Sequence, residues 1–217
     1  MVWLISVASL SAQQIDKKKG TTTDVNLVVS PQVIASAQMA VQTLGDKVVK
    51  GDFMFAYKMM YLRHKKRQEA LHGKQNLKNQ FVNAANQLNK LNVAITQFKA
   101  ERPTGFFKVW PVITAEAKLK IARGEQASPK ANEIEDHWMI IVPTTQVWSF
   151  MKNRSGKVRR LSRKGFQIAV AKVAKTPGQE KWTFVDGASM KPQQLRALFP
   201  SLAADLLLPK KVDKELK

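Results

Sequence analysis

The stretch Trp138-Met-Ile-Ile-Val-Pro-Thr-Thr-Gln-Val-Trp-Ser-Phe-Met151 carries no charged residue and is rich in β-branched and aromatic side chains. This composition predicts a long strand. Two further strands are predicted at Phe166–Val173 and Lys181–Val185, because turn residues at Asn153–Gly156 and Thr176–Gly178 separate the three apolar stretches. Consecutive strands joined by such short loops favour an antiparallel sheet.

The residues before this stretch extend the predicted sheet. Phe106–Ile113 is predicted to be a strand that contains a bulge, or lies at a sheet edge, at Pro111. Ala115–Gly124 leaves two interpretations open, since its lysines alternate with apolar residues as in a strand, while its alanine and lysine content suits a helix. Glu125–Glu135 is predicted to be a loop.

Three helices are predicted ahead of the sheet. Ser30-Pro31 supplies an N-cap and a first-turn proline for the first helix. Its apolar residues recur every three or four positions, at Ile34, Ala37, Val41, Leu44 and Val48. Asp52 is predicted to cap a second helix with an apolar stripe from Phe53 to Tyr61. The cations of Arg63–Arg67 would then lie near the C-terminus of that helix, where the macrodipole favours them.

The third predicted helix has the most regular pattern. Its stripe, which is typical of core contact, consists of Leu77, Phe81, Ala84, Leu88, Leu91, Ile95 and Phe98. Pro103 is predicted to end it. After the last strand, Ser189 is predicted to cap a short helix at Pro192–Phe199. The sequence therefore predicts an α+β fold in which N-terminal helices pack on a curved antiparallel sheet and a short helix follows.

Length and composition favour one domain, over residues 25–209. The 217 residues are 44% hydrophobic, which is enough for a single sizeable core. No cysteine is present, so disulfides, thiolate zinc sites and cysteine nucleophiles are excluded. Lys and Arg number 36 against 16 Asp and Glu, and the resulting formal charge of +20 favours anionic partners.

The two ends of the sequence are predicted to lie outside this domain. Residues 1–12 are apolar and close on small residues, which predicts a secretory signal and a periplasmic or secreted protein; the alternative is a buried N-terminal strand or helix. Residues 13–24 are polar and basic, and are predicted to form a flexible leader. The charged tail Lys210–Lys217 is predicted to fray.

A family resemblance rests on short motifs at both ends of the domain. Gly51-Asp52-Phe53 and Ala56-Tyr57 open the second predicted helix, and Trp182-Thr-Phe-Val-Asp186-Gly187, Leu195-Arg196 and Leu198-Phe199-Pro200 follow the last predicted strands. Together with helices that lead into an antiparallel meander, these motifs resemble the nuclear transport factor 2-like (cystatin-like) superfamily over roughly residues 30–209. The C-terminal motifs also resemble exported proteins of that type.

The resemblance implies that helices pack on the concave side of a bent sheet and enclose a conical pocket. Members of the superfamily include isomerases, dehydratases, transport adaptors and non-catalytic domains, so the fold alone does not decide the function. An enzyme would need an acid or base in the pocket. The candidate pocket residues are Tyr57, Tyr61, Trp110, Asp136, His137, Trp148 and Trp182. Asp136 and His137 are strand neighbours, so only one of them can point inward.

The densest cluster of charge lies between the second and third predicted strands. Seven cations occur there without one acid: Lys152, Arg154, Lys157, Arg159, Arg160, Arg163 and Lys164. A turn that presents these cations could bind phosphate or sulfate groups, whereas the alternative is a solvated hairpin kept from aggregating by its charge. Aromatic residues are not interleaved with the cations, which makes single-stranded nucleic acid a less favoured partner.

Other chemistries have little support in the sequence. The three histidines, His64, His72 and His137, lack metal-ligand spacing, and no glycine-rich phosphate loop or nucleophile elbow occurs. We therefore predict no cofactor and no metal. The favoured function is a non-catalytic exported domain that associates with an anionic glycan, lipid headgroup or cell-wall polymer through the basic hairpin, with a homodimer through the sheet also considered. The alternative is a small-molecule binder or an isomerase- or dehydratase-type enzyme that uses the pocket.

Overall fold

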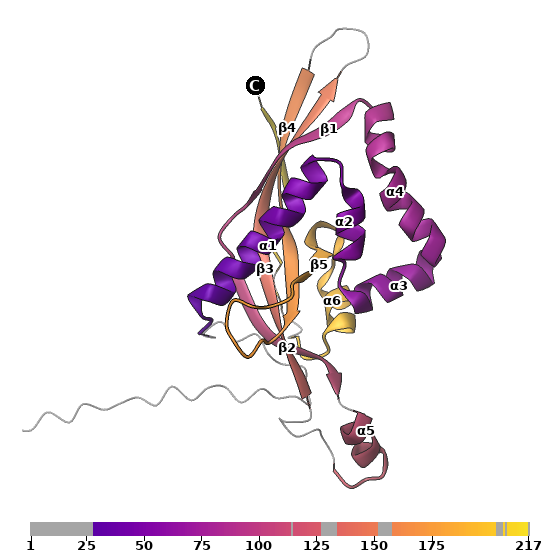
Figure 1. Ribbon diagram of the computed structural model, residues 1–217, viewed down its shortest axis with the longest axis vertical. Coiled ribbons are helices and arrows are strands. Elements are labelled where there is room, and N and C mark those ends of the chain that lie inside the picture. Colours follow the sequence, from indigo (N-terminus) through magenta and orange to yellow (C-terminus); the bar gives the residue numbers. More distant parts are fainter. Residues whose placement is uncertain are drawn as a thin grey trace, which may run out of the picture.

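The computed structural model describes residues 28–113, 115–126, 134–151, 158–202, 206 and 208–216. Within them the chain is an α+β protein, as predicted (Figure 1). The helices are α1 (Pro31–Val49), α2 (Phe53–Lys58), α3 (Leu62–His72), α4 (Lys74–Lys90), α5 (Ala115–Ala122), the 3-10 helix η2 (Gly187–Ser189) and α6 (Pro192–Leu198). The strands are β1 (Val93–Ala100), β2 (Gly105–Ile113), β3 (Ile134–Met151), β4 (Val158–Lys172), β5 (Thr183–Asp186) and β6 (Val212–Leu216). The predicted signal at 1–12 and leader at 13–24 lie outside the described residues.

Two long antiparallel strands form the centre of the sheet. β3 and β4 pair without a bulge from His137 opposite Lys172 to Met151 opposite Val158, a length of roughly 50 Å at about 3.3 Å per residue. Each central strand pairs on its outer side with two shorter strands that follow one another along its length. β1 and β2 pair with β3, and β6 and β5 pair with β4. All of these pairings are antiparallel.

Both faces of the sheet carry an apolar core, because neighbouring strand residues point to opposite sides. On one face Ile140 belongs to a cluster that includes Val41 and other buried residues of α1, and this helix runs across the sheet in Figure 1. On the other face Met139 belongs to a cluster that includes Leu195 and Phe199 at the C-terminal helix. The sheet therefore lies between the first helix and the last.

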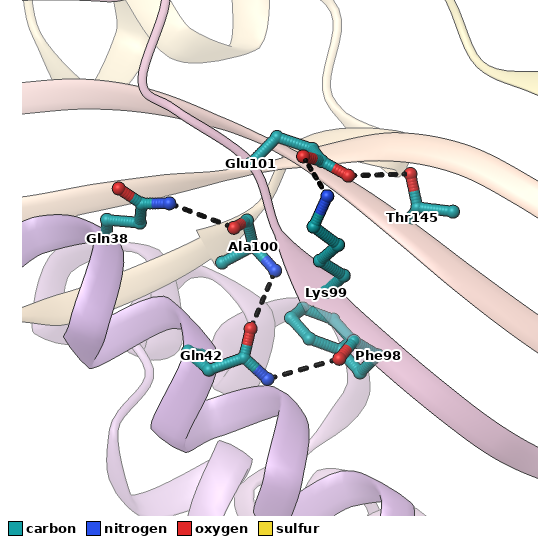
Figure 2. Close-up of polar contacts among 7 residues, drawn as sticks. All are labelled: Gln38, Gln42, Phe98, Lys99, Ala100, Glu101 and Thr145. Atoms are coloured by element: carbon teal, nitrogen blue, oxygen red, sulfur yellow. Dashed lines mark hydrogen bonds and ion pairs between the residues drawn. The ribbon is translucent and has the colours of Figure 1, made fainter.

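Two glutamines of α1 cover the outer edge of β1 (Figure 2). Gln42 Nε2 donates to Phe98 O at 3.1 Å, and Ala100 N donates to Gln42 Oε1 at 2.8 Å. Gln38 Nε2 donates to Ala100 O at 3.0 Å. A carboxamide has the donor and acceptor of a peptide group, so these side chains take the place of a neighbouring strand and protect an otherwise open sheet edge.

The first predicted helix is confirmed, and so is the cap of the second. Ser30 Oγ accepts from Val33 N at 3.4 Å, and Asp52 Oδ1 accepts from Phe55 N at 3.1 Å. Each hydroxyl or carboxylate satisfies one of the free N–H groups of a helix start. Asp52 is therefore engaged as a helix cap.

The second predicted helix is interrupted between α2 and α3. Phe184 N donates to Met59 O and Tyr61 N donates to Phe184 O, both at 2.8 Å, so Met60 forms a parallel bridge with β5. This backbone pairing removes the residues from a helical path. The prediction of one helix through Tyr61 is wrong beyond Lys58. The Arg63–Arg67 cations begin at the first turns of α3, so the macrodipole explanation for them is also wrong.

The third predicted helix is correct only in its first part. α4 ends at Lys90, Leu91 forms the C-cap, and Asn92 adopts the left-handed conformation with a φ of 52°. Asn is the residue other than Gly that most readily ends a helix this way. The chain then continues as β1, and the prediction of helix as far as Phe98 is therefore wrong for the strand residues.

The remaining strands and helices match the predictions with shifted boundaries. The ambiguous segment after β2 is helix α5, and all four predicted strands occur. β3 begins at Ile134, inside the predicted loop, and β4 begins at Val158. The predicted C-terminal helix is α6, although Lys191 rather than Ser189 occupies its N-cap.

The prediction that the C-terminal tail frays is wrong for most of its residues. Val212–Leu216 forms β6, which pairs with Arg160–Lys164 of β4. All five of its residues are exposed. Backbone pairing and charge, rather than an apolar face, hold this strand in place.

Candidate anion-binding surface

The end of the β3–β4 hairpin extends past α1, and the C-terminal end of the chain lies beside it (Figure 1). We call the described part of this region the outer hairpin. It consists of residues 146–151 of β3, residues 158–164 of β4 and β6. Four of the predicted anion-binding cations lie in it: Arg159, Arg160, Arg163 and Lys164. The other three, Lys152, Arg154 and Lys157, lie outside the described residues.

The four described cations divide equally between the two faces of the sheet. Successive side chains of a strand point to opposite sides. Arg159 and Arg163 therefore share the face that α1 covers further along the sheet, and Arg160 and Lys164 lie on the opposite face. The cluster predicted from the sequence as one site is thus two separate pairs.

Acidic residues of β6 neutralise the first pair. Arg159 Nε donates to Glu215 Oε1 at 2.8 Å, and Arg163 makes a bidentate contact with Asp213, with nitrogen–oxygen distances of 2.9 and 3.2 Å. The Arg163 guanidinium also lies 4.9 Å from the centroid of the Trp148 ring. We call this side the paired face, since its cations already have partners.

The ion pairs on the paired face shift the pKa values of their members. Hydrogen bonds from Arg163 and Arg159 lower the pKa of Asp213 and of Glu215. The Glu215 carboxylate in turn raises the pKa of Arg159. The strand β6 therefore carries both acids in ionised form at neutral pH, where they attract the two arginines.

Among the described residues, three cations on the opposite side have no acidic partner. In β6, Lys214 lies opposite Ser162 of β4, and directly opposite residues share a face. Lys214 therefore joins Arg160 and Lys164, and all three side chains are exposed. Within the described part of the chain, no ion pair involves any of these three cations. We call this side the basic face.

An open groove of about 320 Å³ lies at the end of the outer hairpin. It is lined by Phe150, Met151, Arg159, Arg160, Leu161 and Glu215. Three of these six side chains are apolar, so the end of the hairpin combines apolar surface with positive charge. The described residues contain no cluster of three His, Asp or Glu side chains that could hold a metal ion.

The candidate pocket residues do not converge on one site. Trp182 packs on the α1 side of the sheet, where its Nε1 donates to Ser36 Oγ at 3.0 Å. Trp110 is buried, and its backbone N donates at 3.1 Å to Ser201 Oγ in the segment after α6. Trp148 lies at the outer hairpin, where its Nε1 donates to Gln146.

The two tyrosines also lie apart and have raised pKa values. Tyr57 Oη donates to Glu69 Oε1 at 3.1 Å, and burial together with this bond raises its pKa. Tyr61 stacks on Phe199 with ring centroids 5.3 Å apart, and burial raises its pKa to about 12. Neither phenol is therefore available as a base near neutral pH.

Asp136 and His137 point to opposite faces, as the alternation along a strand requires. Asp136 pairs with Lys108 at 3.0 Å. His137 Nδ1 lies 3.1 Å from Glu135 O, and burial lowers the pKa of the ring. Since a carbonyl oxygen only accepts, Nδ1 carries the proton of the neutral ring. These two residues do not form an acid–base pair.

Comparison with protein families, with curated proteins and with solved structures finds no match to this chain. None of the described helices is long and apolar enough to cross a membrane.

The sequence prediction missed the contribution of the C-terminal tail. Val212-Asp-Lys-Glu-Leu216 alternates apolar and cationic residues with acidic ones. In a strand, this alternation places Lys214 on one face and the two acids on the other. The period of two was visible in the sequence, and it is the signal that could have predicted both β6 and its division of charge.

Proposed function

We propose that the protein is a non-catalytic exported domain that associates with an anionic surface or polymer through the basic face of the outer hairpin. The observation that carries this proposal is the way β6 distributes charge. Its acids pair with Arg159 and Arg163, while Lys214 adds to Arg160 and Lys164 on the other side. One face thus has three exposed cations on a chain whose formal charge is +20.

The electrostatics of such a surface favour anionic groups spaced along a polymer or spread over a surface. Each cation that contacts a phosphate or sulfate releases condensed counterions, so affinity depends on salt. The full charge of the chain attracts polyanions over long distances, whereas a local cluster of cations decides where they bind. The basic face is such a cluster because Arg160 and Lys164 lie four residues apart on β4, and Lys214 of the adjacent strand β6 lies opposite Ser162, midway between them.

The test is a salt titration of binding to heparin, chosen as a well-defined polyanion. Arg160→Gln with Lys164→Gln should weaken binding and lower the dependence of log affinity on log salt by about 1 to 2. The matched control is Lys74→Gln with Lys78→Gln, which removes the same charge from exposed positions of α4. An equal loss in both variants would mean that net charge alone attracts the polymer, and the proposal would fail.

We also propose that the chain is a member of the nuclear transport factor 2-like superfamily. Helices α1–α4 precede the antiparallel sheet, α1 packs across one of its faces, and the Trp182–Gly187 motif includes β5 and the start of η2. These features support the proposal. A crystal structure is expected to show a sheet that curves around α1, and a flat sheet would contradict the assignment.

A further inference from the structure

We propose that the basic face of the outer hairpin docks on an anionic lipid bilayer. The inference rests on the proposed function and names the anionic surface. It starts from the apolar residues among the cations of that face. Met151, Val158, Val212 and Leu216 are 59, 52, 53 and 37% exposed. For hydrophobic side chains on a water-facing strand, this exposure is unfavourable unless another surface covers them.

The strand register places these apolar residues on the same face as the cations. Met151 lies opposite Val158. Arg160 lies opposite Leu216, and Lys164 lies opposite Val212. Side chains of directly opposite residues are about 5 Å apart at Cβ. Two of the three unpaired cations of this face therefore each have an exposed apolar side chain beside them.

This combination suits a bilayer better than a soluble polymer. A sulfated or phosphorylated polymer binds through charge and gains nothing from contact with Val or Leu side chains. At the surface of a bilayer, lysine and arginine meet anionic headgroups while apolar side chains enter the boundary of the acyl chains. Interleaved cations and apolar side chains on one sheet face satisfy both requirements at once.

The opposite side of the hairpin explains why docking uses one face. Arg159 and Arg163 are already paired with Glu215 and Asp213. A bilayer approaching the paired face would meet two acids beside the two arginines, and the local charge there cancels. The difference between the faces therefore orients the protein, with the basic face against the lipid and the paired face away from it.

The experiment measures co-sedimentation with vesicles of phosphatidylcholine alone and with vesicles in which a third of the lipid is phosphatidylglycerol. The parent protein should bind only the anionic vesicles. Met151→Ser with Val158→Ser should lower its partition into them on the order of 10-fold, through the loss of apolar contact. Its heparin affinity should stay unchanged, because no charge is altered. Leu71→Ser with Val82→Ser, two exposed apolar residues of α3 and α4, is the matched control.

The charge variants separate this inference from the proposed function. Arg160→Gln with Lys164→Gln should lower anionic-vesicle partition on the order of 20-fold and should weaken heparin binding as well. If the serine variant binds anionic vesicles as well as the parent does, or if the parent binds heparin but no vesicle, the bilayer inference is overturned and the proposed function stands. If the Lys74→Gln with Lys78→Gln control loses as much for both ligands, both proposals fail. Circular dichroism during heating checks that each variant remains folded.

Discussion

At the scale of single residues, Gln42 has an unusual role for a helix side chain. It joins Phe98 O and Ala100 N of β1, and it also donates to Asp46 at 2.8 Å (Figure 2 shows the two contacts to β1). Ala100 is buried, with 5% of its surface exposed. The backbone N–H of this buried residue loses its acceptor if the carboxamide is removed, so Gln42 contributes to stability as well as to protection of the edge.

Gln42→Ala is expected to destabilise the protein by about 1 to 3 kcal/mol, the cost of a buried unsatisfied backbone group. Gln42→Glu should also destabilise it, because a carboxylate has no donor for Phe98 O and lies beside Asp46. The measurement is urea unfolding. Thr43→Ala, at the next and exposed position of α1, is the control and should change stability by no more than about 0.5 kcal/mol. Equal effects at the two positions would show that the carboxamide contacts add nothing.

At the scale of helices and strands, the sequence correctly predicted elements that contribute buried apolar residues to the two cores. Ala37, Val41 and Leu44 of the predicted stripe are buried in α1, and Ile140, in the uncharged part of β3, is buried in the core on the α1 face. Such elements must match an apolar period, because transfer of apolar surface from water is the largest favourable term in folding.

The predictions were wrong where backbone conformation or pairing with a distant strand, rather than burial of apolar side chains, determines the structure. Residues at 91, 95 and 98 fit a helical period, yet the left-handed conformation of Asn92 ends α4, and β-branched Val93, Ile95 and Thr96 favour the strand that follows. The break after α2 depends on backbone pairing with β5, which is distant in sequence. The basic cluster divides into two pairs because residues 159–164 belong to β4, whereas the predicted strand begins at Phe166. Alternation along β4 places Arg159 and Arg163 on one face and Arg160 and Lys164 on the other.

The attachment of β6 should depend on pH. Ion pairs lower the pKa of Asp213 and Glu215 in the folded state, so their stabilising effect is present above the ordinary carboxyl pKa and is lost as pH falls through the lowered values. Below about pH 4 we therefore expect faster amide hydrogen exchange at Val212–Leu216, corrected for intrinsic rates, while α1 remains protected.

The control for this experiment removes the titrating groups. Asp213→Asn with Glu215→Gln should make exchange in β6 fast at neutral pH and nearly independent of pH. Protection of β6 that stays constant through the acidic range in the parent protein would show that backbone pairing alone holds the strand.

At the scale of the whole molecule, two electrostatic effects of salt oppose each other. Salt weakens the ion pairs, but these are at the surface: the least exposed, Lys108–Asp136 and Arg163–Asp213, have side chains with 28 to 37% of their area exposed. Such pairs are worth about 0 to 1 kcal/mol each. Salt also screens the mutual repulsion of a chain with a formal charge of +20. Because repulsion acts between all the excess cations, it should be the larger effect.

We therefore expect the melting temperature to rise with sodium chloride between about 10 mM and 150 mM, where the Debye length falls from about 30 Å to about 8 Å. A gain of about 1 kcal/mol corresponds to about 2 to 4 °C for a chain of this size. Differential scanning calorimetry measures it. Lys74→Gln with Lys78→Gln, which lowers the net charge without removing an ion pair among the described residues, should melt higher at low salt and respond less to added salt. A melting temperature that falls as salt is added would mean that the surface ion pairs outweigh the repulsion, and the excess charge would then cost the fold little.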